Sequence, residues 1–215
     1  MICGVDEAGR GPVIGPMVVC GLCIESDKPL KALKVKDSKR LTPKKREELE
    51  PKIRKIARVQ LVEVPADQID ALRERMSLNK LEARVFASII DSLCPDKAYV
   101  DAADTDQERF GRLVKRSLKR EIPIVSEHRA DDTYPVVSAA SIVAKVERDR
   151  RIAEIEEELG EPIGSGYTHD PVTISFIESW VKARKKFPPY TRESWLTSKN
   201  IMTMNMMRKL DEFED

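Results

Sequence analysis

Short apolar runs alternate along the chain with longer stretches in which apolar residues recur every three or four positions. The short runs are rich in Val, Ile and Leu and end at turn-forming residues, which is typical of buried strands. They predict five strands, at 1–6, 17–24, 59–64, 97–101 and 122–126. The longer stretches have the period of an amphipathic helix.

Helix starts can be read at several positions. Thr42 and Pro43 combine a capping hydroxyl with a proline at the first helical position, and Pro51 is then expected to end or kink that helix. Ser77 is predicted to cap a longer helix. The apolar face of this helix is expected to carry Leu78, Leu81, Val85, Ile89 and Leu93. A further helix is predicted over 107–118.

The order of these elements predicts an α/β fold, with five strands interleaved with helices and a largely helical chain from about residue 132. No internal repeat or low-complexity segment interrupts the pattern. The 215 residues, 41% of them hydrophobic, are enough for a sizeable core. We predict a main domain at 1–150 and a C-terminal helical subdomain with a tail at 151–215.

The composition argues against membrane insertion and secretion. The longest apolar run, 12–24, contains prolines and glycines and is shorter than the roughly 20 residues that span a bilayer. The N-terminus shows no basic region before an apolar stretch, so no secretory signal is predicted. We therefore expect a cytoplasmic protein without a membrane partner.

The four cysteines do not predict a disulfide framework or a zinc site. Cys20 and Cys23 have an odd spacing in one predicted strand, which sends their side chains to opposite faces. Cys3 and Cys94 have apolar neighbours, so all four are interpreted as small buried hydrophobes in a reducing compartment. Two histidines are too few for a zinc site of the usual kind.

Basic charge is concentrated in one segment. The net charge of the chain is only +1, but residues 28–58 carry thirteen Lys and Arg against four acids, a local charge of +9. The rest of the chain is therefore acidic. Such a segment is compatible with a solvated face, and it is also what a polyanion partner such as nucleic acid requires.

Acidic residues follow two of the predicted strands. Asp6 and Glu7 directly precede a Gly-Arg-Gly turn at 9–11, and Asp101 ends a later strand. Acids at a strand end can bind a divalent cation, and glycines let backbone N–H groups approach a phosphate or sugar closely. Open α/β sheets place their ligands at the carboxyl ends of strands. Turn and cap roles remain the alternative for each acid.

A second acidic pair, Asp131 and Asp132, is predicted to open the helix that carries residues 138–141. One of the two is expected near the N-cap of that helix, which is a structural role. The residues by themselves do not choose between them.

Six motifs occur together and in a fixed order: Asp-Glu-Ala-Gly-Arg-Gly at 6–11, Asp-Ser-Lys at 37–39, Tyr-Val-Asp at 99–101, His-Arg-Ala-Asp at 128–131, Ser-Ala-Ala-Ser at 138–141 and Gly-Ser-Gly-Tyr at 164–167. Over about residues 1–195 the chain closely resembles ribonuclease HII in its archaeal form. The resemblance implies a ribonuclease H-like mixed five-stranded sheet flanked by helices, with a C-terminal helical subdomain. It also implies an endoribonuclease that cleaves RNA in RNA/DNA hybrids and incises 5′ of ribonucleotides embedded in duplex DNA.

The resemblance implies an active site of four carboxylates, at Asp6, Glu7, Asp101 and Asp131, that serve as catalytic residues and metal ligands. Two divalent ions, Mg²⁺ or Mn²⁺, would activate a water and stabilise the leaving 3′ oxygen, which gives 5′-phosphate and 3′-hydroxyl products. In a regular strand Asp6 and Glu7 point to opposite faces, so a shared site requires the chain to leave strand geometry at Glu7.

Selection of RNA over DNA depends on the 2′-hydroxyl of the ribose. The resemblance implies that the backbone of Gly9, Arg10 and Gly11 contacts this hydroxyl and that Tyr167 completes the recognition of a ribonucleotide followed by a deoxyribonucleotide. It further implies contacts with the phosphate backbone from Ser38, Lys39 and Asn79. Lys145, Asp170 and Thr173 are expected to have structural roles.

The tail differs from the globular pattern. Leu210 and Phe213 resemble part of the clamp-binding tail of replication enzymes, although Met207 stands where glutamine is usual and Glu214 where a second aromatic is usual. A sliding clamp is therefore a candidate partner. Packing of the tail methionines within a helix is the alternative.

Two other functions remain open from the sequence. One is a different metal-dependent nuclease or strand-transfer enzyme on the same sheet, and the other is an inert hybrid-binding module. The four acids argue against the inert module, and the Gly-Arg-Gly turn with Tyr167 argues against an enzyme of DNA alone. No interface pattern stands out, so a monomer is expected.

Overall fold

The computed structural model describes residues 1–35 and 41–211, with side chains up to Met207. The chain divides into two compact units. The first consists of Met1–Ala8, Val18–Glu63 and Met76–Arg148, and the second of Gly9–Met17, Val64–Arg75 and Asp149–Asp215. The later boundary lies close to the predicted division at residue 150, but the second unit also takes two earlier segments. The assignment of 1–150 and 151–215 as domains stays a prediction.

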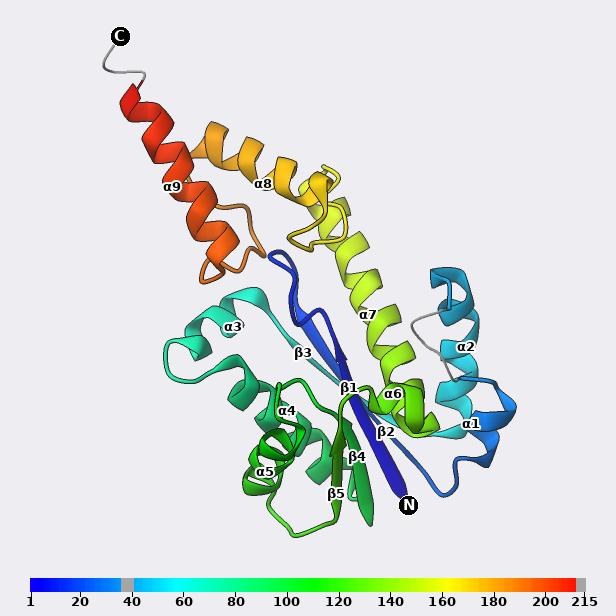
Figure 1. Cartoon of the computed structure of the whole chain (residues 1–215). Coiled ribbons are helices and arrows are strands. Elements are labelled where there is room, and N and C mark those ends of the chain that lie inside the picture. Colours follow the sequence, from blue (N-terminus) through cyan, green and yellow to red (C-terminus); the bar gives the residue numbers. More distant parts are fainter. Residues whose placement is uncertain (36–40, 212–215) are drawn as a thin grey trace. The chain divides into compact units, whose positions relative to one another are not determined.

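A mixed five-stranded sheet forms the centre of the first unit (Figure 1). Its strands are β1 (Ile2–Ala8), β2 (Met17–Ile24), β3 (Arg58–Val64), β4 (Lys97–Asp101) and β5 (Ile124–Glu127), and their order in the sheet is β3-β2-β1-β4-β5. β1 pairs antiparallel with β2 and parallel with β4, which is parallel to β5. The predicted fold class and all five predicted strands are confirmed.

Strand β1 is longer than predicted. It continues past Asp6 to Ala8, because Glu7 and Ala8 pair with Val19 and Val18 of β2. The chain therefore keeps strand geometry at Glu7, so the departure that a metal site shared by Asp6 and Glu7 was expected to require does not occur. The first residue after the strand is Gly9, whose φ of 79° lies in the left-handed region that favours glycine.

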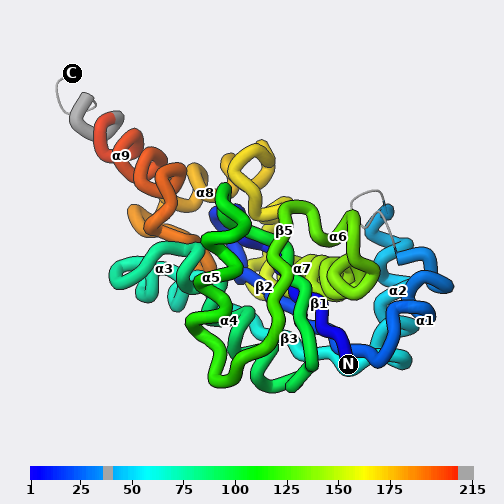
Figure 2. Tube along the Cα trace, turned by 60° about the horizontal axis from the view of Figure 1, so that its bottom comes forward, coloured from blue at the N-terminus to red at the C-terminus, as the bar shows by residue number. Residues whose placement is uncertain are grey.

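Helices cover both faces of the sheet. The helices of the first unit are α1 (Lys28–Ala32), α2 (Pro43–Ile56), α4 (Leu78–Leu93), α5 (Gln107–Ser117), α6 (Ala130–Thr133) and the first part of α7 (Pro135–Leu159). Figure 1 shows α1, α2 and α7 on one side of the sheet and α4 and α5 on the other, and Figure 2 shows the same separation from a second direction. A buried cluster that includes Leu30, Ile53 and Val143 joins α1, α2 and α7.

The predicted caps are confirmed. The Thr42 hydroxyl accepts a hydrogen bond from the backbone N–H of Lys45, and the Ser77 hydroxyl from that of Lys80. Helix α2 does not end at Pro51 but continues to Ile56. Leu49 and Ile53, on either side of the proline, are both buried, and this packing outweighs the lost backbone hydrogen bond.

The buried face of α4 differs slightly from the predicted one. Leu81, Ile89 and Leu93 are buried as expected, but Leu78 and Val85 are only partly buried. Phe86 and Ile90 contribute to the core of this helix instead, and Phe86 packs edge-on against Phe110 of α5.

Cysteine burial also departs from the prediction at one position. Cys3, Cys20 and Cys23 are buried, as expected, whereas Cys94 is exposed. Cys94 follows α4 in a left-handed conformation with a φ of 52°, at the point where the chain leaves the helix. Its place at a helix end explains its exposure.

Within the described residues, no helix is both long and apolar enough to cross a membrane.

The second unit is largely helical. It contains α3 (Ala66–Arg73), the end of α7, α8 (Pro171–Arg184) and α9 (Leu196–Asp211). Its core is apolar and draws on residues far apart in the sequence. It includes Val13, Ile14, Ile152, Ile163, Phe176, Ile177, Val181 and Ile201. Val13 and Ile14, between β1 and β2, are therefore anchored in the core of this unit.

Close packing on the sheet generates the first prediction. A Cβ at Gly4 of β1 would lie 2.3 Å from the backbone carbon of Val136 in α7, and backbone atoms cannot move aside cheaply. We expect Gly4→Ala to lower the free energy of unfolding by about 1–3 kcal/mol, as overpacking of a core does. Urea denaturation of the purified protein measures the change.

Gly11→Ala serves as the control, because no atom lies within 4 Å of the Cβ that it adds. An equal loss of stability in the two variants would contradict the packing argument.

Candidate active site

The pairing of β1 with β4 places two acids side by side. Val5 is the register partner of Val100 in this parallel pair, so the next residues along both strands are Asp6 and Asp101. Residues at matched positions of parallel strands point to the same face of the sheet. Asp6 is buried and Asp101 is partly buried at the end of its strand.

A tight reversal after β5 provides the third acid. Arg129 adopts a left-handed conformation with a φ of 57°, and the short helix α6 follows at once. The backbone N–H of Ala130 donates to Oδ1 of Asp101 at 3.0 Å, which ties α6 to the end of β4. Asp131 is the next residue and is 1% exposed.

The sequence predicted that Asp131 and Asp132 open the helix that carries residues 138–141. In the structure they do not. Asp131 and Asp132 lie in α6, and α7 begins separately at Pro135. Tyr134 between the two helices is extended, because the residue before a proline is disfavoured in the helical region.

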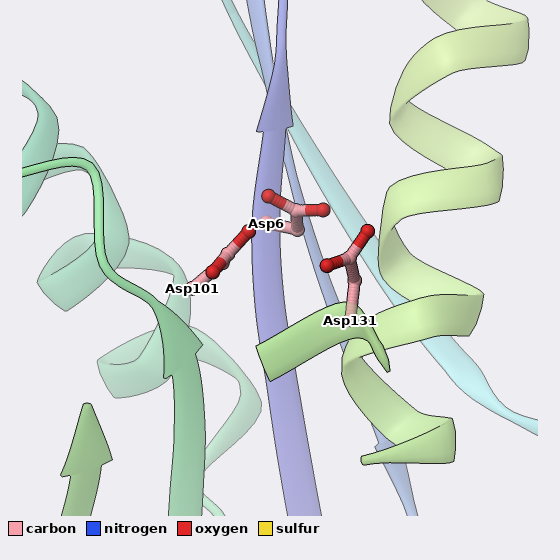
Figure 3. Close-up of side chains that lie close together, drawn as sticks. All are labelled: Asp6, Asp101 and Asp131. Carbon is pink, nitrogen blue, oxygen red and sulfur yellow. The ribbon is translucent and has the colours of Figure 1, made fainter. Parts of the chain in front are cut away.

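Asp6, Asp101 and Asp131 converge. Each offers a carboxylate oxygen, and these oxygens all lie within 4.8 Å of one another. Figure 3 shows the three side chains pointing toward one another from β1, from the end of β4 and from α6. Carboxylate oxygens are hard ligands that suit Mg²⁺ and Mn²⁺. The donor set therefore fits a divalent cation.

The structure distinguishes Asp131 from its neighbour. Asp132 is not one of the converging carboxylates. Its Oδ2 lies 3.4 Å from Nε of Arg129, and the residue is partly exposed. Of the two acids that the sequence left open, only Asp131 joins Asp6 and Asp101.

Glu7 is placed differently from the other three predicted acids. It lies in regular strand geometry after Asp6, and its backbone N–H donates to Oδ1 of Asp6 at 2.8 Å. It is not among the three carboxylates that meet, although its charge acts on Asp6. Its role as a metal ligand stays a prediction.

Burial raises the pKa of Asp6 well above its usual range, and repulsion from Glu7 and Asp101 raises it further. Lys145 and a hydrogen bond with Ser141 oppose the shift, and Lys145 in turn donates to the Ser141 hydroxyl. A carboxyl that holds a proton must lose that proton to solvent before it can bind a metal, so metal affinity should rise with pH. The sequence carried no signal for this contact of Ser141.

The Gly-Arg-Gly turn and the Gly-Ser-Gly-Tyr loop lie next to each other in the second unit. The carbonyl of Gly166 accepts hydrogen bonds from the N–H groups of Val13 at 2.8 Å and Ile14 at 3.2 Å. Tyr167, the next residue, is partly buried, and its ring centroid lies 5.5 Å from that of His169. The segment that follows the turn is thus bonded by its backbone to the loop that carries Tyr167.

Asp170 and Thr173 hold the Gly-Ser-Gly-Tyr loop, in the structural roles expected of them. The Asp170 carboxylate accepts from the N–H and hydroxyl of Ser165, and these bonds lower its pKa to about 2. The Thr173 hydroxyl accepts from the N–H of Gly166 at 2.9 Å and donates to the carbonyl of Ile163.

The predicted phosphate contacts are only partly described. Asn79 lies in the first turn of α4, and a hydrogen bond from its side chain helps lower the pKa of Asp104. The larger cause of that shift is Arg109, whose guanidinium binds both oxygens of Asp104. Ser38 and Lys39 lie outside the described residues.

The family model for ribonuclease HII matches residues 3–198 of the chain. The chain belongs to the ribonuclease HII family. A ribonuclease HII of Methanocella arvoryzae is 48% identical over 216 residues, which cover 99% of this chain and 96% of that protein. The crystal structure of the ribonuclease H2 from Pyrococcus horikoshii OT3 matches with a TM-score of 0.88 and 43% identity, over 95% of this chain and 98% of that one.

A second solved ribonuclease HII, from the PCNA:RNase HII complex of Archaeoglobus fulgidus, has a TM-score of 0.87 and 41% identity, over 94% and 96% of the two chains. The sheet is thus the ribonuclease H-like fold that the motifs implied. As a ribonuclease HII the chain is a type 2 ribonuclease H, a hydrolytic and metal-dependent endoribonuclease.

The two neighbouring acids of α6 allow a matched test of the cluster. We expect Asp131→Asn to weaken Mn²⁺ binding at least about tenfold, because it removes one of three converging carboxylates. Asp132→Asn makes the same chemical change one residue away, beside Arg129, and should leave the affinity unchanged. Isothermal titration calorimetry measures both. The reverse result would show that the wrong acid has been assigned.

Proposed function

We propose that this ribonuclease HII hydrolyses the RNA strand of RNA/DNA hybrids and incises 5′ of ribonucleotides embedded in duplex DNA, leaving 5′-phosphate and 3′-hydroxyl ends. The convergence of Asp6, Asp101 and Asp131 supports the hydrolytic part of this proposal. The backbone bonds between the segment after the turn and the Tyr167 loop support the selection of a ribonucleotide.

Asp6, Glu7, Asp101 and Asp131 are proposed to hold two divalent ions, Mg²⁺ or Mn²⁺. Such ions supply activation of the attacking water and stabilisation of the leaving 3′ oxygen. The chain provides a rigid frame for these ligands. Asp6 lies in β1, which pairs with β2 on one side and with β4 on the other. Asp101 is held by the N–H of Ala130, which donates to its Oδ1.

Gly9, Arg10, Gly11 and Tyr167 are proposed to recognise the ribose. A 2′-hydroxyl both donates and accepts hydrogen bonds, and only a ribonucleotide carries it. Gly11 is exposed and has no atom within 4 Å of the place where a Cβ would lie, so a sugar can approach its backbone. Tyr167 follows Gly166, whose carbonyl binds the segment after the turn.

Ser38, Lys39 and Asn79 are proposed to contact the phosphate backbone, which positions the duplex without reading its sequence. Asn79 is oriented for this role by its hydrogen bond with Asp104, which Arg109 holds in place. The protein is proposed to act as a monomer.

Cleavage of a duplex with one embedded ribonucleotide tests the proposed reaction. We expect incision 5′ of the ribonucleotide with Mg²⁺ or Mn²⁺, no cleavage of the all-DNA duplex and no activity in chelator. Asp101→Asn should lower the rate at least about a thousandfold, since it removes a ligand but keeps the oxygen that accepts from Ala130. Asp132→Asn is the matched control and should remain active.

The outcomes separate the alternatives. Cleavage of all-DNA duplex would indicate another nuclease of the same fold. Binding of the hybrid without cleavage in either metal would indicate an inert binding module, and full activity in chelator would contradict the carboxylate site.

The C-terminal tail is proposed to bind a sliding clamp. A structurally similar ribonuclease HII was solved in a complex with PCNA. In this chain α9 carries three exposed methionines, Met204, Met206 and Met207, so the helix that leads to the tail presents apolar side chains to solvent. Leu210 and Phe213 would be the anchoring residues.

We expect the double change Leu210→Ala and Phe213→Ala to weaken clamp binding about thirtyfold, the loss of one hot-spot anchor or more. Surface plasmon resonance against the clamp measures the affinity. Leu196→Ala, at the other end of α9 and 73% exposed, is the control. Cleavage of a short duplex without clamp should be the same in all three proteins. Clamp binding by the double variant that equals binding by the parent protein would exclude the tail as the clamp site.

A further inference from the structure

Arg192 is among the largest fully buried side chains of the protein, with no exposed surface. It lies shortly before α9, and its guanidinium reaches the turn that follows β1. Nη1 donates to the carbonyl of Arg10 at 2.8 Å, and Nη2 donates to the carbonyl of Gly9. Nε and Nη2 donate to the carbonyl of Gly15 at 3.1 and 2.9 Å.

A buried guanidinium is costly unless its donors are satisfied. Here one planar group binds carbonyls at both ends of the segment from Gly9 to Gly15. The backbone adds two bonds to the same segment: the N–H of Arg192 donates to Val13 at 2.8 Å, and that of Gly15 donates to Tyr190 at 2.9 Å. The conformation of the turn therefore depends on this arginine.

Trp195 extends the same contact. Its indole Nε1–H donates to the carbonyl of Gly11 at 3.2 Å, and its ring lies 4.9 Å from the guanidinium carbon of Arg192. The carbonyls of Gly9, Arg10 and Gly11 thus all accept hydrogen bonds from side chains of the segment 192–195.

The direction of these carbonyls sets the direction of the amides. In a planar trans peptide the N–H points opposite to the C=O of the same unit. The C=O of Gly9 shares a peptide unit with the N–H of Arg10, and the C=O of Arg10 shares one with the N–H of Gly11. Because both carbonyls face the buried guanidinium, both N–H groups face away from it.

We propose that Arg192 is a positioning residue for ribose selection, which rests on the proposed role of residues 9–11. It directs the amides of Arg10 and Gly11 away from the core, toward the side where a 2′-hydroxyl would bind. Hydrogen bonding at the carbonyl also polarises each peptide unit, which strengthens its N–H as a donor. Lysine cannot replace it, because an ammonium lacks the planar fork that binds three carbonyls at once.

Arg192→Lys tests the proposal, with Arg73→Lys as a matched control. Arg73 lies in the same unit and over the same Trp195 ring, at 4.5 Å, but it donates to the Ser194 hydroxyl and not to a carbonyl of the turn. Both changes are made in an Asp101→Asn background, so that binding is measured without cleavage. Fluorescence anisotropy gives Kd for a duplex with one ribonucleotide and for the matching all-DNA duplex.

The Kd ratio is Kd for the all-DNA duplex divided by Kd for the duplex with one ribonucleotide. We expect Arg192→Lys to lower this ratio at least about tenfold toward unity, with Kd for the all-DNA duplex nearly unchanged. With Asp101 restored, kcat/KM on the ribonucleotide substrate should fall about a hundredfold, the typical effect of a displaced contact. Mn²⁺ affinity should be unchanged, since the converging carboxylates belong to the other unit. Arg73→Lys should match the parent in every measurement.

Trp195→Phe provides a second variant in case Arg192→Lys folds poorly. It keeps a ring beside Arg192 but removes the N–H that binds Gly11, so the Kd ratio should fall about fivefold, the effect of one hydrogen bond. A ratio equal to that of the parent in both variants would overturn the proposal. Equal weakening of both Kd values, with a lower Tm, would show a purely structural arginine and would overturn it as well.

A parent protein without preference for the ribonucleotide would instead show that the proposed ribose selection itself is wrong. Arg192 would then have no role in ribose selection either. Retained preference in Arg192→Lys, beside a parent that discriminates, contradicts only the role of Arg192.

Discussion

The parallel pairing of β1 with β4 is the constraint on which the acidic cluster depends. The register that aligns Val5 with Val100 brings Asp6 beside Asp101, although 95 positions separate them in the sequence. Neither strand can slip by one residue without turning its acid to the other face of the sheet. Tight packing of α7 against Gly4 helps to hold this register, because the glycine leaves room for the helix backbone. The core of the first unit therefore determines the geometry of the ligands.

The same arrangement places carboxylates of like charge close together in a buried position. Asp6 is buried beside other carboxylates, and its raised pKa expresses the cost of ionising it there. A site of this kind is not optimised for the stability of the metal-free chain, because repulsion and desolvation both oppose folding with the acids charged. Divalent cations would remove that repulsion, so metal binding and stability are coupled. Ser141 and Lys145 partly compensate for the charge from inside α7.

The three converging acids and the proposed ribose sensor belong to different units, although Asp6 and Gly9 lie close together in the sequence. The first segment of the first unit ends at Ala8, and the first segment of the second unit begins at Gly9. The turn is held by Arg192 and Trp195, and the Tyr167 loop is held by Asp170 and Thr173 together with the backbone of Val13. The first unit thus holds the three converging carboxylates, and the second holds the turn and the loop that are proposed to select the substrate.

Local patterns in the sequence determined the five strands, the caps at Thr42 and Ser77 and the family motifs, because these depend on residues near one another in the chain. Local patterns left alternatives open where distant packing decides: α2 does not end at Pro51, and β1 continues through Glu7. The choice of Asp131 over Asp132 also required the fold, since adjacent acids differ only in what they face. Arg192 carried no signal in the sequence, because its importance arises from carbonyls more than 170 positions away that only the folded chain brings to its guanidinium.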